Sequence, residues 1–142
     1  MVATDGARAY RANSILTASP GQLVLMLYDG ALKSLAQARE AFTRPREDFR
    51  RIAVINQHLL KAQRIISELQ GSLKMDAGDG QFAREMQRLY DYYNRRLLEA
   101  NMQKQVEPVI EIERLLGELR DAWAEMLRKD DGTTVGTGRG VG

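Results

Sequence analysis

Apolar residues recur every three or four positions along most of the chain, a spacing that predicts long amphipathic helices. The clearest start signal is the string Ser19-Pro20-Gly21-Gln22. Its serine can cap a helix, its proline suits the first helical position, and its glutamine completes a capping box. We expect four helices, which run from this string to about Phe42, from Pro45 to Gly71, from about Gln81 to Lys104, and from Pro108 to about Arg128.

The order of these elements predicts the fold class. No stretch shows the alternation of apolar and polar residues that is typical of a half-buried strand. Long helices joined by short loops favour antiparallel neighbours, so we predict an all-α fold, an antiparallel up-down four-helix bundle. The stretch from Asp130 to Gly142 holds five glycines, and we expect a flexible, disordered tail there.

Two of the expected helices carry a single apolar stripe, as a bundle core requires. Trp123 lies on the stripe of the fourth expected helix, where we interpret it as a core anchor rather than a platform for a ligand. The stripe of the third helix consists of Phe82, Met86, Leu89, Tyr90, Tyr93, Leu97 and Ala100, and that of the fourth of Ile112, Leu115, Leu116, Leu119, Trp123, Met126 and Leu127.

The first expected helix is apolar on all sides over its early turns, from Leu23 through Leu25 and Met26 to Tyr28. A surface helix needs an apolar arc of only about 100° or somewhat more. Part of this segment must therefore be covered, either by another part of the chain or by a partner.

The second expected helix carries Asn56, Gln63 and Ser67 along one line inside an apolar face, with Val54 and Ile65 off the main stripe. Buried polar groups need hydrogen bonds. The three side chains therefore form either a satisfied polar layer in the core or a groove that meets the backbone of a bound segment. Further apolar residues outside the stripes are Tyr92, Leu98 and Ile110. Together they suggest a second apolar surface, of the kind that holds an amphipathic helix or an extended peptide.

Composition narrows the function classes. The 142 residues suffice for one domain with a real core, and the net charge of +2 is too small to argue for a nucleic-acid partner. Positive charge gathers in residues 39–64 and negative charge in residues 106–128, which we interpret as solvated faces that attract each other. The longest apolar run, Leu23 to Tyr28, is far too short for membrane insertion. With no secretory signal at Met1 to Gly6, we expect a cytoplasmic protein.

Catalytic and metal chemistry lack their usual residues. The chain has no cysteine and one histidine, His58, so neither a zinc site nor a nucleophile–base pair can be argued. A di-iron bundle would need a glutamate three residues before a histidine, and position 55 is Ile55. We expect no enzyme activity, no cofactor and no metal, and place His58 on a helix surface or edge.

Specific strings resemble the FliS family of flagellar export chaperones over about residues 9–127. The most specific part runs from Thr17 to Gly30. The matching strings are Tyr10, Ile15-Leu16-Thr17-Ala18-Ser19-Pro20, Gln22-Leu23-Val24, Met26-Leu27-Tyr28-Asp29-Gly30-Ala31, Lys61-Ala62-Gln63-Arg64-Ile65-Ile66, Glu68-Leu69, Leu89-Tyr90-Asp91-Tyr92, Leu97-Leu98, Ala100-Asn101, Leu116, Leu119-Arg120 and Trp123. The loop at residues 72–80 and the glycine-rich tail follow no motif of the family.

The resemblance implies a client, the disordered C-terminal region of flagellin, which the family holds in the cytoplasm so that it neither polymerises early nor degrades. It also implies that the loaded complex meets the export gate of the flagellar type III secretion apparatus. In this family the N-terminal segment can lie over the client groove. We therefore expect three parts, an N-terminal cap segment at residues 1–18, the bundle at residues 19–129 and the tail at residues 130–142.

The flagellin-binding groove candidates combine the cap with the unusual helix positions described above. They are Tyr10, Ile15, Leu16, Leu23, Leu25, Met26, Val54, Asn56, Gln63, Ile65, Ser67, Tyr92 and Leu98. Two rival hypotheses stay open. The extra apolar surface could be a homodimer interface, or the second helix could bind nucleic acid, which the small net charge argues against.

Overall fold

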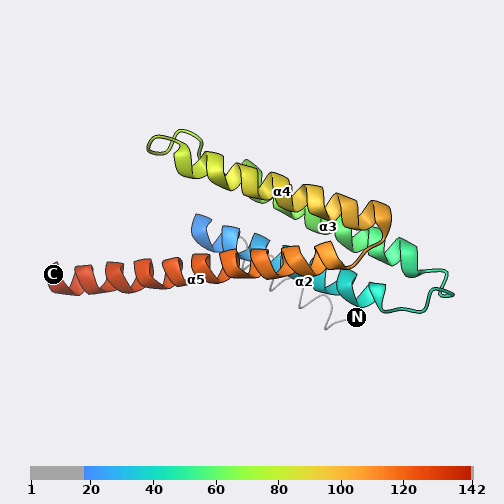
Figure 1. Cartoon of the computed structure of the whole chain (residues 1–142). Helices are drawn as coiled ribbons and strands as arrows, with labels where there is room; N and C mark the ends of the chain where they lie inside the picture. The colour runs from blue at the N-terminus through green and yellow to red at the C-terminus, as the bar shows by residue number, and fades with distance from the viewer. Residues whose placement is uncertain (1–17, 142) are drawn as a thin grey trace.

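The computed structural model describes the backbone of residues 18–141 and the side chains of residues 18–130. This part of the chain forms four α-helices and no strand, which confirms the predicted fold class (Figure 1). The helices are α2 (Pro20–Phe42), α3 (Arg51–Gly71), α4 (Gln81–Gln103) and α5 (Glu107–Val141).

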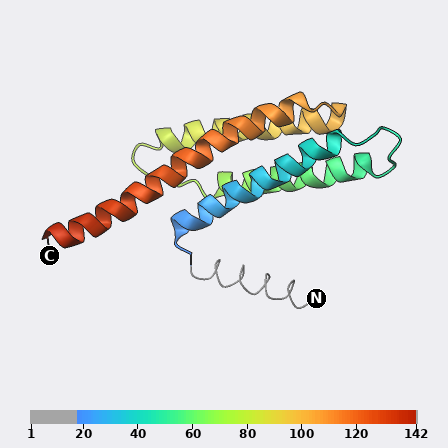
Figure 2. The same cartoon turned by 90° about the horizontal axis from the view of Figure 1, so that it is seen from below.

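The four helices pack around a ring, in which each contacts two neighbours. Helix α2 packs against α3 and α5, and helix α4 packs against the same two helices from the opposite side. Figure 2 shows successive helices running in opposite directions, with α2 beside α3 and the start of α5 beside the end of α4. The arrangement is the predicted antiparallel bundle, and it gives the molecule four seams between helices.

The helix ends follow local chemistry, with one correction. Helix α2 has the predicted capping box, because the Ser19 side chain accepts from the Gln22 amide while the Gln22 side chain accepts from the Ser19 amide. The prediction that Pro45 opens the second helix is wrong, since α3 begins six residues later. Pro45 instead starts a turn, in which its carbonyl accepts from Asp48 at 3.0 Å, and the Asp48 carboxylate then accepts from the Arg50 amide.

Glycine is required at the entrance to α4. Gly80 has a φ of 76°, and a Cβ atom there would lie 2.7 Å from the carbonyl oxygen of Met75. Both facts exclude an ordinary side chain without a backbone shift. The loop at residues 72–80 therefore turns tightly into α4, as its Asp and Gly content predicts.

The core contains most of the predicted stripe residues. Side chains from all four helices form one buried cluster, whose large members include Leu35, Leu59, Ile66, Leu97 and Leu116. Tyr28 of α2 and Tyr90 of α4 meet across it, with 2.6 Å between their hydroxyl oxygens. Three stripe residues were expected in the core and are exposed instead. They are Phe82, Leu89 and Met126.

Helix α5 is longer than predicted. Its backbone stays helical to Val141 instead of ending near Arg128, and it extends past the other helices (Figures 1 and 2). The flexible tail expected from residue 130 onward stays a prediction, although the described backbone is helical on both sides of that residue. Glycine lowers helix stability by about 1 kcal/mol per residue without breaking the helix, whereas proline breaks a helix interior, and no proline follows Pro108.

Candidate functional site

The seam between α2 and α5 is closed along its length. Arg39 binds Glu113 through two hydrogen bonds of 2.7 and 3.2 Å, and Arg120 binds Asp29 at 2.8 Å. Farther along, the Trp123 indole donates to the carbonyl oxygen of Gly21 at 2.8 Å. The absence of a side chain at Gly21 lets Leu127 lie close, because a Cβ atom there would be 2.6 Å from its methyl carbon.

The seam between α4 and α5 is tied at one end by a polar cluster. Glu111 accepts a hydrogen bond from the Tyr92 hydroxyl at 2.5 Å and another from Arg96 at 2.9 Å. Arg96 also reaches Glu99 on its own helix. The bond from Tyr92, and then the one from Arg96, lowers the pKa of Glu111 below its ordinary value.

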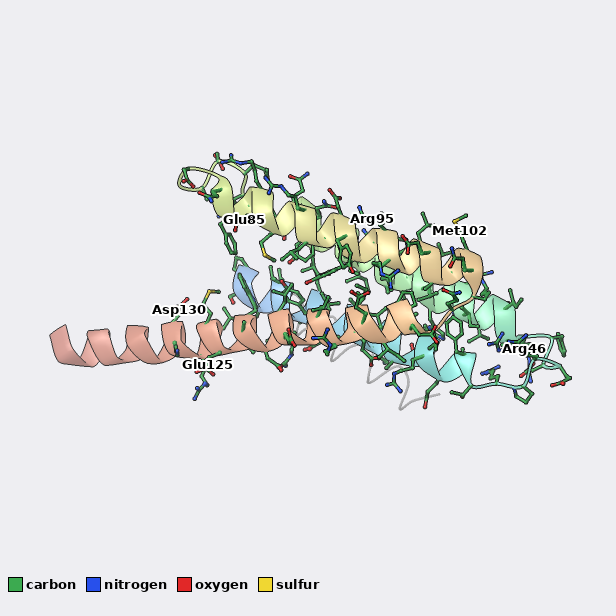
Figure 3. The ribbon with its side chains drawn as sticks, in the orientation of Figure 1. Arg46, Glu85, Arg95, Met102, Glu125 and Asp130 are labelled. Carbon is green, nitrogen blue, oxygen red and sulfur yellow. The ribbon has the colours of Figure 1, made fainter. Side chains whose placement is uncertain are left out.

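Toward its other end the same seam is open and apolar. In antiparallel helices the pairing of Tyr92 and Arg96 with Glu111 places Leu89 opposite about residues 114–118 and Phe82 opposite about residues 121–125. Here Phe82 is 69% exposed, Leu89 38% and Met126 39%. The two helices diverge toward this end, where Figure 3 labels Glu85 on α4 and Glu125 on α5. We call Phe82, Leu89 and Met126 the open seam.

A groove of about 550 Å³ follows the outer side of the seam between α3 and α4. Most of the side chains that line it are polar, and the half-exposed Leu60 is the apolar member. Leu98, four residues after Asn94 on α4, is exposed to a similar degree. The residues that line this α3/α4 groove are Leu60, Gln63, Arg64, Ser67, Glu68 and Asn94.

Hydrogen bonds in the α3/α4 groove join the two helices through amide nitrogens. The Gln63 side chain donates to the Asn94 carbonyl oxygen, and the Asn94 side chain donates to the Ser67 hydroxyl, both at 3.2 Å. The side-chain oxygens of Gln63 and Asn94 are buried, and neither has a hydrogen-bond partner among the described residues. Two buried acceptors therefore lie at the groove without donors.

Hydrogen bonds join the same seam on either side of the groove. At one end the Lys104 ammonium donates to Asn56 at 2.7 Å and to two oxygens of Asn101. At the other end the Gln70 side chain donates to Gln87 and Asp91. The polar line of the second predicted helix is therefore a hydrogen-bonded layer between α3 and α4, and part of it also lines a groove.

Comparisons with known proteins point to one family. The family described as "Flagellar protein FliS" matches residues 3–130. The flagellar secretion chaperone FliS of Bacillus subtilis is 36% identical over 130 residues, which cover 92% of each chain. The FliS of Salmonella typhimurium is 34% identical over 91% of this chain and 95% of its own, and that of Escherichia coli is 34% identical over 89% and 93%.

The chain belongs to the FliS family. Its relatives are named as flagellar secretion chaperones, which is a binding role and not a catalytic one. The resemblance predicted from the sequence strings is thereby confirmed. Among the described residues of this FliS-family chain, the open seam and the α3/α4 groove both expose apolar side chains between two helices.

The predicted groove residues divide among several places. Asn56, Gln63, Ser67 and Leu98 lie along the seam between α3 and α4, around the α3/α4 groove. Leu23 and Met26 are each 37% exposed in the first turns of α2, and Leu25 is half-buried. The expectation that part of early α2 needs a cover stays a prediction.

The remaining candidates pack within the bundle or lie outside the described residues. Val54 and Ile65 are half-buried against the core, and a Cβ atom at Gly30 of α2 would lie 3.5 Å from the terminal methyl carbon of Ile65. Tyr92 is held by Glu111, so its ring belongs to the tied end of the seam. The residues predicted for the cap, Tyr10, Ile15 and Leu16, lie outside the described residues.

Sequence reasoning missed the open seam and Asn94. Phe82, Leu89 and Met126 lie on the core stripes, and a stripe does not say how far the neighbouring helix follows it. A signal was present for Asn94, because it falls on the α3 side of α4 one turn before Leu98. Its connection to Gln63 can be seen only once α3 and α4 are known to pack against each other.

Other chemistry is sparse in the described part of the chain. His58 is partly buried, and burial, then the nearby Lys61 and Arg44, lowers its pKa. Among the residues described, no group of three or more acidic, histidine or cysteine side chains gathers as metal ligands would. Likewise, none of the described helices combines the length and apolar character that crossing a membrane requires.

Proposed function

We propose that this chain is a cytoplasmic export chaperone that binds the disordered C-terminal region of flagellin and delivers it to the flagellar type III secretion apparatus. One observation carries the proposal, together with membership of a family of flagellar secretion chaperones. The apolar stripes of α4 and α5 continue beyond the packed core and end exposed at Phe82, Leu89 and Met126. An amphipathic helix laid into the open seam would complete that interrupted core.

The energetics suit a client that has no structure alone. A disordered segment loses conformational entropy when it binds, so it needs a long apolar contact to compensate. The open seam offers side chains from two helices, and the half-exposed Leu60 and Leu98 extend apolar contact to the α3/α4 groove. A segment that follows both surfaces would wrap around α4, which lies between them.

The N-terminal cap remains part of the proposal. Tyr10, Ile15 and Leu16 supply apolar side chains just before α2, whose first turns expose Leu23 and Met26. A cover that must leave before the client binds lowers the apparent affinity by the fraction of chaperone that is uncovered. The cap would thus keep the empty chaperone from associating through its apolar surface, and loading would free the cap as a signal to the export gate.

Titration calorimetry tests the client assignment directly. We expect tight binding to flagellin from the same organism and none to flagellin that lacks its C-terminal segment. A Phe82→Ser, Met126→Ser double variant should fold and bind weakly, whereas Met102→Ser on the far end of α4, where Met102 is 76% exposed, is the matched control and should bind normally (Figure 3).

Two results would contradict the proposal. If the truncated flagellin binds as tightly as the whole protein, the client segment is wrong. If neither form binds and the mass of the chaperone rises with concentration, the open seam is instead a homodimer interface, which its exposed apolar side chains also suit.

A further inference from the structure

The two unpaired oxygens of the α3/α4 groove are unusual within their own seam. Polar side chains follow one another between α3 and α4, and those nearer each end have hydrogen-bond partners, as Asn56 and Gln70 do. Only in the groove do buried acceptors of this seam, on Gln63 and Asn94, lack a donor among the described residues. A buried acceptor without a donor destabilises a fold, so its retention calls for a reason.

The missing partners must be donors. Both amide nitrogens are already engaged, with the Asn94 carbonyl and the Ser67 hydroxyl. The terminal torsion of an amide side chain is soft, so a small rotation would turn either oxygen toward the groove that its residue lines. What the groove lacks is therefore a group that brings N–H donors and fits between half-exposed leucines.

We propose that Gln63 and Asn94 form a selection site for the side-chain carboxamide of one asparagine or glutamine in the bound segment. The inference rests on the proposed function, since the segment is flagellin's C-terminal region. A carboxamide carries two N–H donors on one nitrogen, enough for both oxygens, and its own oxygen can accept from the Ser67 hydroxyl.

Other donors suit the site less well. The interior backbone N–H groups of a helical client are used within that helix, so only its first turn could donate. A lysine or arginine would have to give up water where the two acceptors are covered from it, and the groove gives it no net charge partner, because Glu68 and Arg64 both line the groove and offset each other. The carboxamide is neutral, and neighbouring apolar residues of the client would lie over Leu60 and Leu98.

A double-mutant cycle tests the selection site. The probe is the C-terminal segment of flagellin from the same organism, in which each asparagine and glutamine is changed in turn to leucine or methionine. Against the unaltered chaperone, one of these changes should weaken binding about tenfold, measured by calorimetry. Against Gln63→Met, which keeps the side-chain length and removes the acceptor, the same change should weaken binding less than about twofold.

Gln70→Met is the matched control. It alters the same residue type on the same seam, but at an amide that is paired with α4. It should therefore preserve the tenfold dependence on the client amide. Thermal melting should show Gln63→Met close to the parent in stability, because removing the unpaired acceptor offsets the loss of the hydrogen bond to the Asn94 carbonyl. Asn94→Leu provides a second route to the same measurement if Gln63→Met folds poorly.

The outcomes separate the two proposals. If the segment binds and no single amide matters, or if the dependence is unchanged in both Gln63→Met and Asn94→Leu, the selection site is wrong and the client assignment stands. If the intact segment does not bind the parent chaperone at all, the client assignment fails, and the selection site fails with it.

Discussion

The two seams of α5 differ in the way they are held. Toward α2, contacts are spread over the length of the helix, from Arg39 with Glu113 to Trp123 with Gly21. Toward α4, hydrogen bonds gather at Glu111, and the apolar side chains beyond it are exposed. The difference teaches that fixing α5 on one side lets the other side stay open, so that an apolar surface can persist without loosening the whole bundle.

The largest expected effect comes from breaking the closed seam. Trp123→Ala should destabilise the fold by about 3 kcal/mol, since it removes a large ring packed on the core and its hydrogen bond to Gly21. Urea unfolding followed by circular dichroism measures this, because the change removes the only tryptophan.

Trp123→Phe separates the two contributions of the ring. It keeps an aromatic ring on the core and loses the donor, so it should cost about 1 kcal/mol. If Trp123→Ala left the unfolding midpoint unchanged, α5 would not be anchored through this residue, and the contrast between the seams would fail.

A smaller loss of stability should follow from removing a hydroxyl of the tyrosine pair, which crosses the core from α2 to α4. Tyr28→Phe leaves the buried Tyr90 hydroxyl without its partner and should cost about 1–3 kcal/mol. The double variant Tyr28→Phe, Tyr90→Phe should cost less than twice that amount, because neither ring then carries an unpaired hydroxyl. A strictly additive result in urea unfolding would mean that the hydroxyls do not interact.

The fold was predictable to a large extent because each signal was local. The capping box at Ser19, the stop at Gly71 and the proline in the first turn of α5 specify helix ends through residues that are neighbours in sequence. The start of α3 was mispredicted for a local reason as well. Pro45 can open a helix or a turn, and the Asp48 carboxylate, which accepts from the backbone after it, favours the turn.

The site was less predictable, because it depends on distances between helices. The amphipathic pattern identifies Phe82 and Leu89 as stripe residues but does not say that α4 leaves α5 there. In the same way, Gln63 was a candidate while its partner Asn94 was not. The apolar pattern describes each helix separately and does not show which residues of two helices meet. A position outside the main apolar stripe was by itself a poor guide to the groove, because Ile65 lies off that stripe and still packs against the core.

Acidity should weaken the tied end of the open seam. The pKa of Glu111 lies below its ordinary value of 4.5, so the stability it contributes is present above that pH and is lost as the pH falls through the lowered pKa. Glu111→Gln should therefore be less stable than the parent at pH 7, by less than the tyrosine variants, and the difference should disappear as the pH falls through the lowered pKa of Glu111. A difference in urea midpoint that stays constant from pH 7 into acid would show that the charge of Glu111 is not what ties α4 to α5.

The smallest effect on stability should come from a substitution in the open seam itself. This result would separate the open seam from the closed seam most clearly. Phe82 is 69% exposed, so Phe82→Ala should change the free energy of unfolding by no more than about 0.5 kcal/mol, although it removes a ring of the same class as that of Trp123. If the open seam holds the client, the same variant should weaken flagellin binding clearly. A residue that contributes little to folding and much to binding is what an exposed end of a core stripe predicts, because its apolar contact is completed only by a partner. A loss of several kcal/mol in the free chaperone would instead mean that Phe82 is covered within this chain, and the seam would then be open only after that cover leaves.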